Sequence, residues 1–413
     1  ALVEQVEVSN QNIRLVEAQF RQARALAQQA RSEYFPLLTG GVSTIRNKPP
    51  SNVSNAQNFN PSINTTYRLN LDASWEPDIW GRVARSVEAG SAGMQASTAD
   101  IEAAKLSAQA ELAQNYFLLR ISDARKKLLD DTVAAYERSL QLTKNQYAVG
   151  VVARADVVTS ETQLKSAKAQ AVDVGIQRAQ LEHAIAVLIG KVPAEFSLPP
   201  ANETFTAVPP SIPLGIPSQL LERRPDIAAA ERRTAQANAR IGVAQAAFFP
   251  SLILSATLGY QSRSFANWLT LPSRFWSLGP ALAQTIFDGG FRKAQKAEAI
   301  AVFDQNAANY RQTVLTAFQE VEDNLASLRI LEEEAQLQED AVKSARESVQ
   351  LTLNQYKAGI VNYLNVVNVE TIALTNERTM LNIQSSRMVA AVLLVKALGG
   401  GWHAAELEKV AKP

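Results

Sequence analysis

Two 21-residue stretches of the sequence share eleven residues in register, although they lie about half the chain apart. One begins at Leu142 and reads LTKNQYAVGVVARADVVTSET, and the other begins at Leu351 and reads LTLNQYKAGIVNYLNVVNVET. A second pair of similar segments, 13–36 and 227–250, ends in Phe-Pro in both copies. Two copies of a long unit indicate a duplication, whereas solenoids repeat a shorter unit many times. The chain is therefore predicted to build one fold twice.

Each half of the sequence predicts a helix, a two-stranded hairpin, a very long helix, a tight turn and a returning helix. The first helical pattern stops at Pro36 or Pro250, because proline cannot continue a helix. Alternation of apolar and polar residues then predicts strands. They cover about 37–45 and 66–75 in the first half and about 251–261 and 276–287 in the second. The predicted fold class is α+β and mainly α.

The duplicated stretch marks the turn between the long helix and the returning helix. Glycine commonly ends a helix by adopting a left-handed conformation, so Gly150 and Gly359 predict turns, here called the tips, near 147–156 and 356–365. The predicted organisation has four parts. They are a first structural repeat (1–190), a Pro-rich connector (191–216), a second structural repeat (217–399) and a C-terminal segment (400–413).

Composition excludes several classes of function. The 413 residues include no cysteine and only two histidines, so disulfides, thiolate chemistry and a histidine-based metal cluster are not expected. A net charge of +1 with scattered basic residues offers no footprint for nucleic acid. Phosphate-binding, metalloprotease and serine-hydrolase motifs are absent from the sequence. We expect neither an enzyme nor a bound cofactor.

The strands carry the features of a membrane protein. No apolar run approaches the roughly 20 residues of a spanning helix, but a membrane strand needs only about 10. The clean alternation of strand 66–75 places Arg68, Asn70 and Asp72 on a polar face, which is predicted to line a lumen. Aromatic residues concentrate in or beside the hairpins, as in the interfacial girdles of transmembrane barrels. The predicted girdle residues are Tyr67, Trp75, Trp80, Tyr260, Trp268 and Trp276. The alternative is that they form the core of a small soluble β-domain.

The start of the sequence is consistent with a processed protein. The chain begins at Ala1 and lacks a basic segment followed by an apolar one, which is the pattern of an export signal. We therefore interpret it as a mature or trimmed chain from which any signal has been removed.

Several motifs resemble the outer membrane factor (TolC-like) family of Gram-negative bacteria, in particular the branch that serves resistance-nodulation-division efflux pumps. The resemblance covers essentially the whole chain. Its motifs are LLERRPDIAAAERR from Leu220, AAFFPSLILSATLGY from Ala246, the two NQYxxG tips and ALGGGW ending at Trp402. Several members of this family are lipoproteins with an acylated N-terminal cysteine. This sequence contains no cysteine, but we expect the segment that usually leads the family to be truncated before Ala1, which leaves lipidation open.

The resemblance implies a homotrimer in the outer membrane that extends into the periplasm. Three chains would form a twelve-stranded β-barrel, continued by a twelve-helix periplasmic α-barrel with an equatorial region supplied by the connector and the C-terminal segment. Loops 45–64 and 261–275 would face the cell exterior. The implied function is a passive exit duct for small molecules in multidrug efflux and antibiotic resistance. The implied partners are a periplasmic adaptor (membrane fusion) protein, an inner-membrane resistance-nodulation-division transporter and outer-membrane lipid.

The resemblance also implies a periplasmic gate at the tips. In the second repeat, Leu364 would supply an apolar constriction, while Asn365 and Asn368 stand where the family often has acidic residues. The corresponding residues of the first repeat are Asp156 and Thr159. Neutral asparagines predict a closed gate that depends less on pH and on divalent cations than an acidic ring. The alternative is that both asparagines merely cap or pack the turn.

Adaptor docking would fall on the two tips and on the grooves between helix pairs. The predicted contact residues are Tyr147, Val149, Gly150, Val151, Tyr356, Gly359, Ile360 and Val361. The alternative for the apolar members of this set is packing within the turn itself.

Two other functions were weighed against efflux. A channel for type I protein secretion would use the same fold with a different cargo. A flagellin-like structural filament would share the Ala-, Gln- and Asn-rich helices and the lack of cysteine, but it does not require a hairpin in both halves of a duplicated chain.

Overall fold

The computed structural model describes residues 2–48, 63–201, 209, 220–405 and 407. The chain divides into two compact units. The helical unit comprises Ala1–Gln19, Thr98–Ala229 and Arg311–Pro413, and the sheet unit comprises Phe20–Ser97 and Ala230–Tyr310. Four helices have parts in both units.

Helices make up most of both repeats. The first repeat contains α1 (Leu2–Ser9), α2 (Gln11–Ser32), α3 (Arg82–Ala148) and α4 (Arg154–Leu188). The second contains α5 (Leu220–Arg223), α6 (Pro225–Ala246), α7 (Phe291–Lys357) and α8 (Tyr363–Ala397). The helices α3 and α7 have 67 residues each, and neither contains a proline to interrupt them. Within the part of the chain that the structure describes, no helix has an apolar stretch suited to crossing a bilayer.

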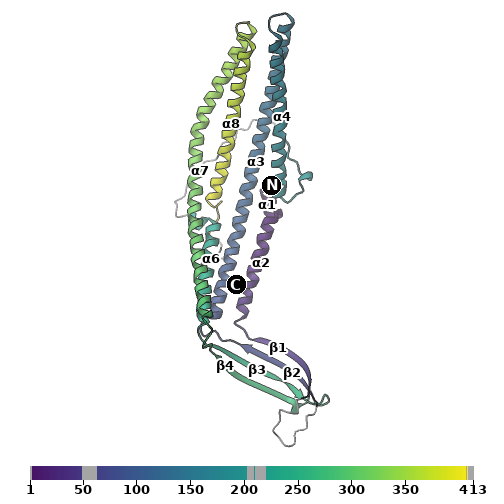
Figure 1. Cartoon of the computed structure of the whole chain (residues 1–413), viewed down its shortest axis with the longest axis vertical. Coiled ribbons are helices and arrows are strands. Elements are labelled where there is room, and N and C mark those ends of the chain that lie inside the picture. The colour runs from purple at the N-terminus through teal and green to yellow at the C-terminus, as the bar shows by residue number, and fades with distance from the viewer. Residues whose placement is uncertain (1, 49–62, 202–208, 210–219, 406, 408–413) are drawn as a thin grey trace. The chain divides into compact units, whose positions relative to one another are not determined.

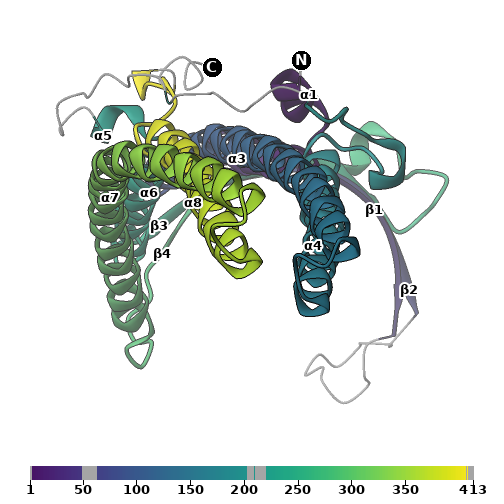
Figure 2. The same ribbon diagram turned by 90° about the horizontal axis from the view of Figure 1, so that it is seen from above.

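In the helical unit, each long helix runs beside the returning helix of its own repeat (Figures 1 and 2). Tyr136 of α3 packs on Leu164 and Ala167 of α4. In the second repeat, the Gln338 side chain of α7 donates a hydrogen bond to the Asn376 side chain of α8 over 2.9 Å. A separate apolar cluster joins α1, α2, α3 and α4. Its buried members are Val6, Ile13, Ala108, Leu112, Leu119, Ile185, Leu188 and Ile189.

The sheet unit contains a single antiparallel sheet with the strand order β1-β2-β3-β4 (Figure 1). Its strands are β1 (Leu37–Asn47), β2 (Asn64–Trp75), β3 (Ser251–Ser262) and β4 (Arg274–Ala283). The central pair, β2 and β3, joins a strand of the first repeat to a strand of the second. The edge strands β1 and β4 each pair on one side only.

The register of the sheet gives it two chemically different faces. Leu71 lies opposite Gly40 on one side and Leu258 on the other, and Leu258 lies opposite Trp276. Directly opposite residues project to the same face, so one face is apolar across all four strands. Its members include Leu38, Val42, Leu69, Leu71, Leu254, Leu258, Trp276, Leu278 and Leu282. The other face carries mainly polar residues.

Two predicted features differ in the structure. The fourth strand was predicted over 276–287 but ends at Ala283. The following segment leaves the sheet because the Thr285 carbonyl accepts a 2.6 Å hydrogen bond from the Arg292 guanidinium rather than from a strand. Most of the predicted loop 45–64 and much of the connector 191–216 lie outside the described residues.

Candidate functional site

The two tips have the same backbone. Gly150 and Gly359 adopt φ values of 77° and 72°, which only glycine adopts without strain. The amide of Gly150 donates to the Tyr147 carbonyl, and the amide of Val151 donates to the Gln146 carbonyl. Equivalent bonds close the second tip. This Schellman arrangement satisfies the last carbonyls of each long helix and reverses the chain.

Two buried tyrosines fasten the second tip to the first repeat. Tyr356 and Tyr363 are 2% and 1% exposed, and their rings lie 5.5 Å apart. The Tyr356 hydroxyl donates to the Thr143 hydroxyl of α3 at 3.3 Å. The Tyr363 hydroxyl donates to the Ser160 hydroxyl of α4 at 3.0 Å. The turn between α7 and α8 is therefore held by hydrogen bonds to both helices of the other repeat.

The predicted gate residues lie close to the start of the returning helices. Leu364, Asn365, Asn368 and Thr159 are exposed, and Asp156 is half-buried. The Asp156 carboxylate accepts a hydrogen bond from the Ala153 amide, so this side chain stabilises the first turn of α4. Asn365 stands at the corresponding position of α8. Its backbone amide donates a hydrogen bond to the side-chain oxygen of Asn362. Leu364, Asn365 and Asn368 thus keep exposed side chains at the second tip.

The predicted docking residues divide into two groups. Tyr147, Val149 and Val151 are exposed at the first tip, as is Ile360 at the second. The structure removes Tyr356 from the accessible surface, because its ring packs inside the tip against Tyr363. Val361 is half-buried against the same tyrosines. Gly150 and Gly359 act through the backbone of the turn.

A carboxyl group that sequence reasoning missed lies beside this tyrosine pair. Glu370 of α8 is half-buried, and its Oε2 atom is fully enclosed without a hydrogen-bond partner among the described residues. Burial without a compensating charge raises the pKa of Glu370 to about 7. Burial, together with the negative charge of Glu370, raises the pKa of the Tyr136 hydroxyl on α3 to about 12. This carboxyl sits where α8 meets the first repeat.

The duplication contains the signal that could have found these residues. The first repeat has Arg154 where the second has Tyr363, and Lys144 where the second has Leu353. A change from a cation to a bulky apolar or aromatic residue at matching positions indicates that the second position is buried.

The polar face of the sheet brings the predicted lumen residues together. The Asn70 side chain donates a hydrogen bond to the Asp72 carboxylate, which also accepts one from Thr257 on β3 at 2.7 Å. The Arg68 guanidinium lies 5.1 Å from the centroid of the Phe275 ring. Gly259 makes room for this ring, because a Cβ atom there would lie 2.9 Å from Cε1 of Phe275.

The predicted girdle aromatics occupy opposite ends of the strands. Near the start of β2, Tyr67 packs against Trp268 with ring centroids 5.9 Å apart. The Trp268 indole donates to the carbonyl of Tyr260 on β3. Trp75, at the other end of β2, donates to the Tyr34 carbonyl at 3.0 Å. Trp276 is 71% exposed on the apolar face of β4.

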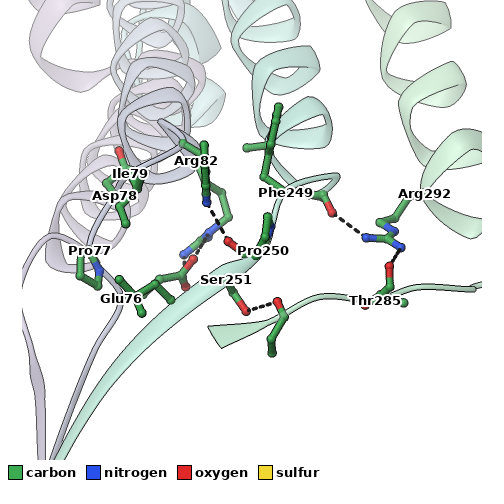
Figure 3. Close-up of a pocket in the computed structure, with 15 residues that line it drawn as sticks. Glu76, Pro77, Asp78, Ile79, Arg82, Phe249, Pro250, Ser251, Thr285 and Arg292 are labelled. Atoms are coloured by element: carbon green, nitrogen blue, oxygen red, sulfur yellow. Dashed lines mark hydrogen bonds and ion pairs between the residues drawn. The ribbon is translucent and has the colours of Figure 1, made fainter. Parts of the chain in front are cut away.

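Trp80 belongs to the junction where the strands meet the helices. It stacks on Phe249 with ring centroids 4.9 Å apart and donates a 2.7 Å hydrogen bond to the Pro250 carbonyl. A cavity of about 160 Å³ opens beside these residues (Figure 3). Arg82 pairs there with Glu76 and Glu33, both at 3.0 Å. Trp80 is thus placed by the turn before α3 rather than by a strand.

A second arginine completes the junction. Arg292 of α7 pairs with Asp288 at 2.7 Å. Its guanidinium also donates to the carbonyls of Ala247 and Thr285 (Figure 3). Each long helix therefore has, within its first two residues, an arginine that ties the neighbouring turns together. We assign this cavity a structural role, because its charged groups are already engaged in ion pairs or, for Asp78, with the backbone amides of Val83 and Ala84.

The described part of the connector is anchored by a buried ion cluster. Asp123 of α3, with a side chain only 3% exposed, pairs with Arg178 at 2.7 Å and with Arg120 at 3.1 Å. The Asp123 carboxylate also accepts a hydrogen bond from the Ala201 backbone amide, and the Arg178 guanidinium donates one to the Leu198 carbonyl. These contacts hold the connector against α3 and α4. The described residues contain no cluster of His, Asp and Glu suited to a metal ion.

Comparisons with known proteins agree with this geometry. The model of the outer membrane efflux protein family matches residues 2–191 and 216–400. The chain is 30% identical to the probable efflux pump outer membrane protein TtgC of Pseudomonas putida, over 97% of this chain and 83% of that protein. It is also 30% identical to the outer membrane protein OprJ of Pseudomonas aeruginosa, over 97% of this chain and 84% of that protein.

Solved structures share the fold. The outer-membrane channel OprN superposes with a TM-score of 0.92 at 30% identity, over 97% of this chain and 89% of that one. The outer membrane protein VceC of Vibrio cholerae superposes with a TM-score of 0.89 at 26% identity, over 97% and 95%. The predicted mainly helical channel fold and the outer-membrane location are therefore confirmed. This chain belongs to the outer membrane efflux protein family.

Proposed function

We propose that three copies of this chain form the outer-membrane exit duct of a tripartite multidrug efflux pump. The duct conducts small molecules passively from a periplasmic adaptor and an inner-membrane transporter of the resistance-nodulation-division class to the exterior. No catalytic step is part of this mechanism. The observation that carries the proposal is the four-stranded sheet, which has one apolar face, one polar face and two unpaired edges.

The edges argue for assembly. An exposed strand edge presents unpaired backbone groups and invites pairing with another chain. Four strands are too few to enclose a lumen, because barrel diameter grows with strand number. Three copies joined edge to edge would supply twelve strands, an even number as in bacterial outer-membrane channels. In this closed sheet the apolar face meets lipid, and Arg68, Asn70 and Asp72 line the lumen.

The aromatic residues fit the same placement. Tyr67, Tyr260 and Trp268 lie toward one end of the strands, and Trp75 lies at the other. Trp80 lies near the same end as Trp75, in the junction between the strands and the helices. Amphipathic rings at both ends of an apolar sheet suit the two headgroup layers of a membrane. The long helices then extend into the periplasm.

The tips serve as gate and docking surface in this proposal. Leu364, Asn365 and Asn368 form the narrow aperture of the closed trimer, with Asp156 and Thr159 beside it. The exposed Tyr147, Val149, Val151 and Ile360 contact the adaptor, together with the backbone at Gly150 and Gly359. The efflux roles stated in the names of the relatives favour small molecules as the cargo.

Two measurements on one preparation test the proposal. Light scattering on the detergent-purified protein should give three chains per particle, and planar bilayers containing it should show discrete conductance steps. Expression in a Gram-negative strain that lacks its exit duct but keeps its pump should restore resistance to pump substrates. A monomeric particle without conductance would overturn the proposal. Restored protein secretion without restored resistance would instead point to a type I secretion channel.

A further inference from the structure

The sheet has an uneven distribution of charge along its strands. The sequence contains no aspartate or glutamate between Glu33 and Asp72, or between Glu231 and Asp288. The end of the sheet that carries the β1–β2 and β3–β4 connections, here called the loop end, has cations only. Four of them, Arg46, Lys48, Arg263 and Arg274, are exposed and, in the described part of the chain, have no ion pair. The fifth, Arg68, is half-buried on the polar face, where it lies over the Phe275 ring.

The opposite end of the sheet is balanced. Arg82 pairs with Glu33 and Glu76, and Arg292 pairs with Asp288. At this end, which adjoins the helices, both arginines have a carboxylate within 3.0 Å. The segments that form the loop end contain no carboxylate residue. The loop end therefore carries a net positive charge that no carboxylate of the same sequence segments offsets.

Two of these cations belong to the apolar face. Arg46 on β1 alternates with Leu38 and Val42, so it projects to their side of the sheet. Arg274 on β4 lies opposite Tyr260, which lies opposite Leu69 on the same apolar face. A cation on a lipid-facing surface is tolerated only near the headgroups. Both arginines therefore lie at the level of the headgroups.

These two arginines lie on the two edge strands. If copies join edge to edge, as in the proposed trimer, β1 of one copy lies beside β4 of the next. Each of the three seams then brings Arg46 and Lys48 of one copy near Arg274 of the neighbouring copy. This step rests on the proposed function. The aromatic group of Tyr67, Phe265 and Trp268 lies at the same end of the sheet.

We propose that each seam at the loop end binds the phosphate groups of an anionic outer-leaflet lipid, with Arg46 and Arg274 as the two recognising side chains. Guanidinium groups match phosphate oxygens in a bidentate geometry. The apolar face directly below them accepts the acyl chains, which commits the site to a lipid rather than to free phosphate. The lipid thereby bridges two copies of the chain.

The test uses the full-length trimer in a non-ionic detergent, titrated with diphosphoryl lipid A and followed by native mass spectrometry. The natural protein should bind up to three lipids. The double variant Arg46→Gln/Arg274→Gln should bind about twenty-five-fold more weakly, because each arginine near anionic lipid contributes roughly a factor of five. The control Arg21→Gln/Arg24→Gln removes the same charge from the exposed face of α2 and should leave binding unchanged.

Two further measurements distinguish the binding of a lipid from the binding of free phosphate. Monophosphoryl lipid A should bind more weakly than the diphosphoryl form, and inorganic phosphate should not displace either lipid. Equal binding by the natural protein and the double variant would overturn the lipid site, provided that the same samples are trimeric and conduct ions. Loss of trimer and conductance in the natural protein would instead overturn the proposed function, and the seam with it.

Discussion

The two tips share the NQYxxG motif and the same backbone, but several matching side chains occupy different environments. Tyr147 of the first tip is 47% exposed, whereas the matching Tyr356 is 2% exposed. Glu161 lies at the surface and pairs with Lys144 at 3.0 Å. Its counterpart Glu370 is half-buried, and its buried Oε2 atom has no hydrogen-bond partner among the described residues. The duplication preserved the turn while its two copies acquired different tasks.

A few substitutions account for the difference. Where the first repeat has Arg154 and Lys144, the second has Tyr363 and Leu353. Leu353 and Tyr363 belong to the apolar cluster of the second tip. The second repeat thus lacks both cations and has more apolar surface at these positions. Glu370 therefore has less contact with solvent than Glu161 and no equivalent of its Lys144 partner. The first tip is thus suited to contacts outside the chain, and the second to holding the helices together.

Removing the aromatic ring from the second tip should have the largest effect. Tyr363→Ala should destabilise the closed tip by about 3 kcal/mol, because it deletes a fully buried aromatic side chain. Hydrogen exchange at the first turns of α8 and single-channel conductance would report the loosened tip. The matched variant Tyr147→Ala removes an exposed ring and should leave both unchanged. Equal effects of the two variants would abolish the distinction between the tips.

Glu370 should give the second tip a dependence on pH. The pKa of its carboxyl is about 7, against an ordinary value of 4.5, so the folded state holds the proton more tightly. This stabilisation is fully present below about pH 4.5 and is lost as the pH rises through 7. We expect the tip to lose about 3 kcal/mol of stability over that range. Hydrogen exchange at α8, measured at about pH 5 and about pH 8, would show it.

The variant Glu370→Gln isolates this effect. It keeps the shape of the side chain and removes its charge, so the variant tip should be more stable than the natural one at about pH 8 and similar to it at about pH 5. Glu161→Gln is the control at the other tip and should not alter the profile. If the Glu370→Gln variant shows the same pH dependence of hydrogen exchange as the natural protein, the titrating group is not Glu370.

The aperture should respond to a change of charge at matching positions. Asp156 of the first tip corresponds to Asn365 of the second. Asn365→Asp adds a carboxylate to the exposed second tip, so magnesium should block the variant channel at concentrations several-fold lower than the natural channel. Titration of bilayer conductance with magnesium measures this shift. Strong block of the natural channel would show that its neutral asparagines do not set its cation sensitivity.

The smallest effect is expected for the surface ion pair of the first tip. Lys144→Gln removes a partner of Glu161 at an exposed site, where such pairs contribute little to stability. Thermal unfolding followed by circular dichroism should be unchanged within error. A clear loss of stability would mean that the first tip also fastens helices in the assembled channel.

Much of the fold could be predicted because proline and glycine end helices through local effects on the backbone, and because the duplication repeats these signals in both halves. Pro36 and Pro250 end helical patterns before strands, and Gly150 and Gly359 end the long helices. The family was identified from motifs that run through the whole chain and was confirmed. These signals depend on neighbouring residues and not on long-range packing.

The interior of the tip could not be predicted in the same way. Tyr356 was expected at the surface with Tyr147, because the NQYxxG motif is the same in both copies. Its burial depends on Thr143 and Tyr363, which are distant in the sequence or on the next helix. Glu370 was missed because its environment comes from Tyr136 and other residues of the first repeat. Tertiary contacts decided these positions.

The strand order has a consequence for how the protein is made. Trp75 of β2 pairs with Leu254 of β3, so the centre of the sheet joins segments separated by nearly half the chain. Contacts between distant segments form slowly, because a long loop must close first. The first hairpin remains without its neighbour until the second repeat has been synthesised. During biogenesis, therefore, the newly made first hairpin has to be shielded from other nascent chains until its own second half arrives.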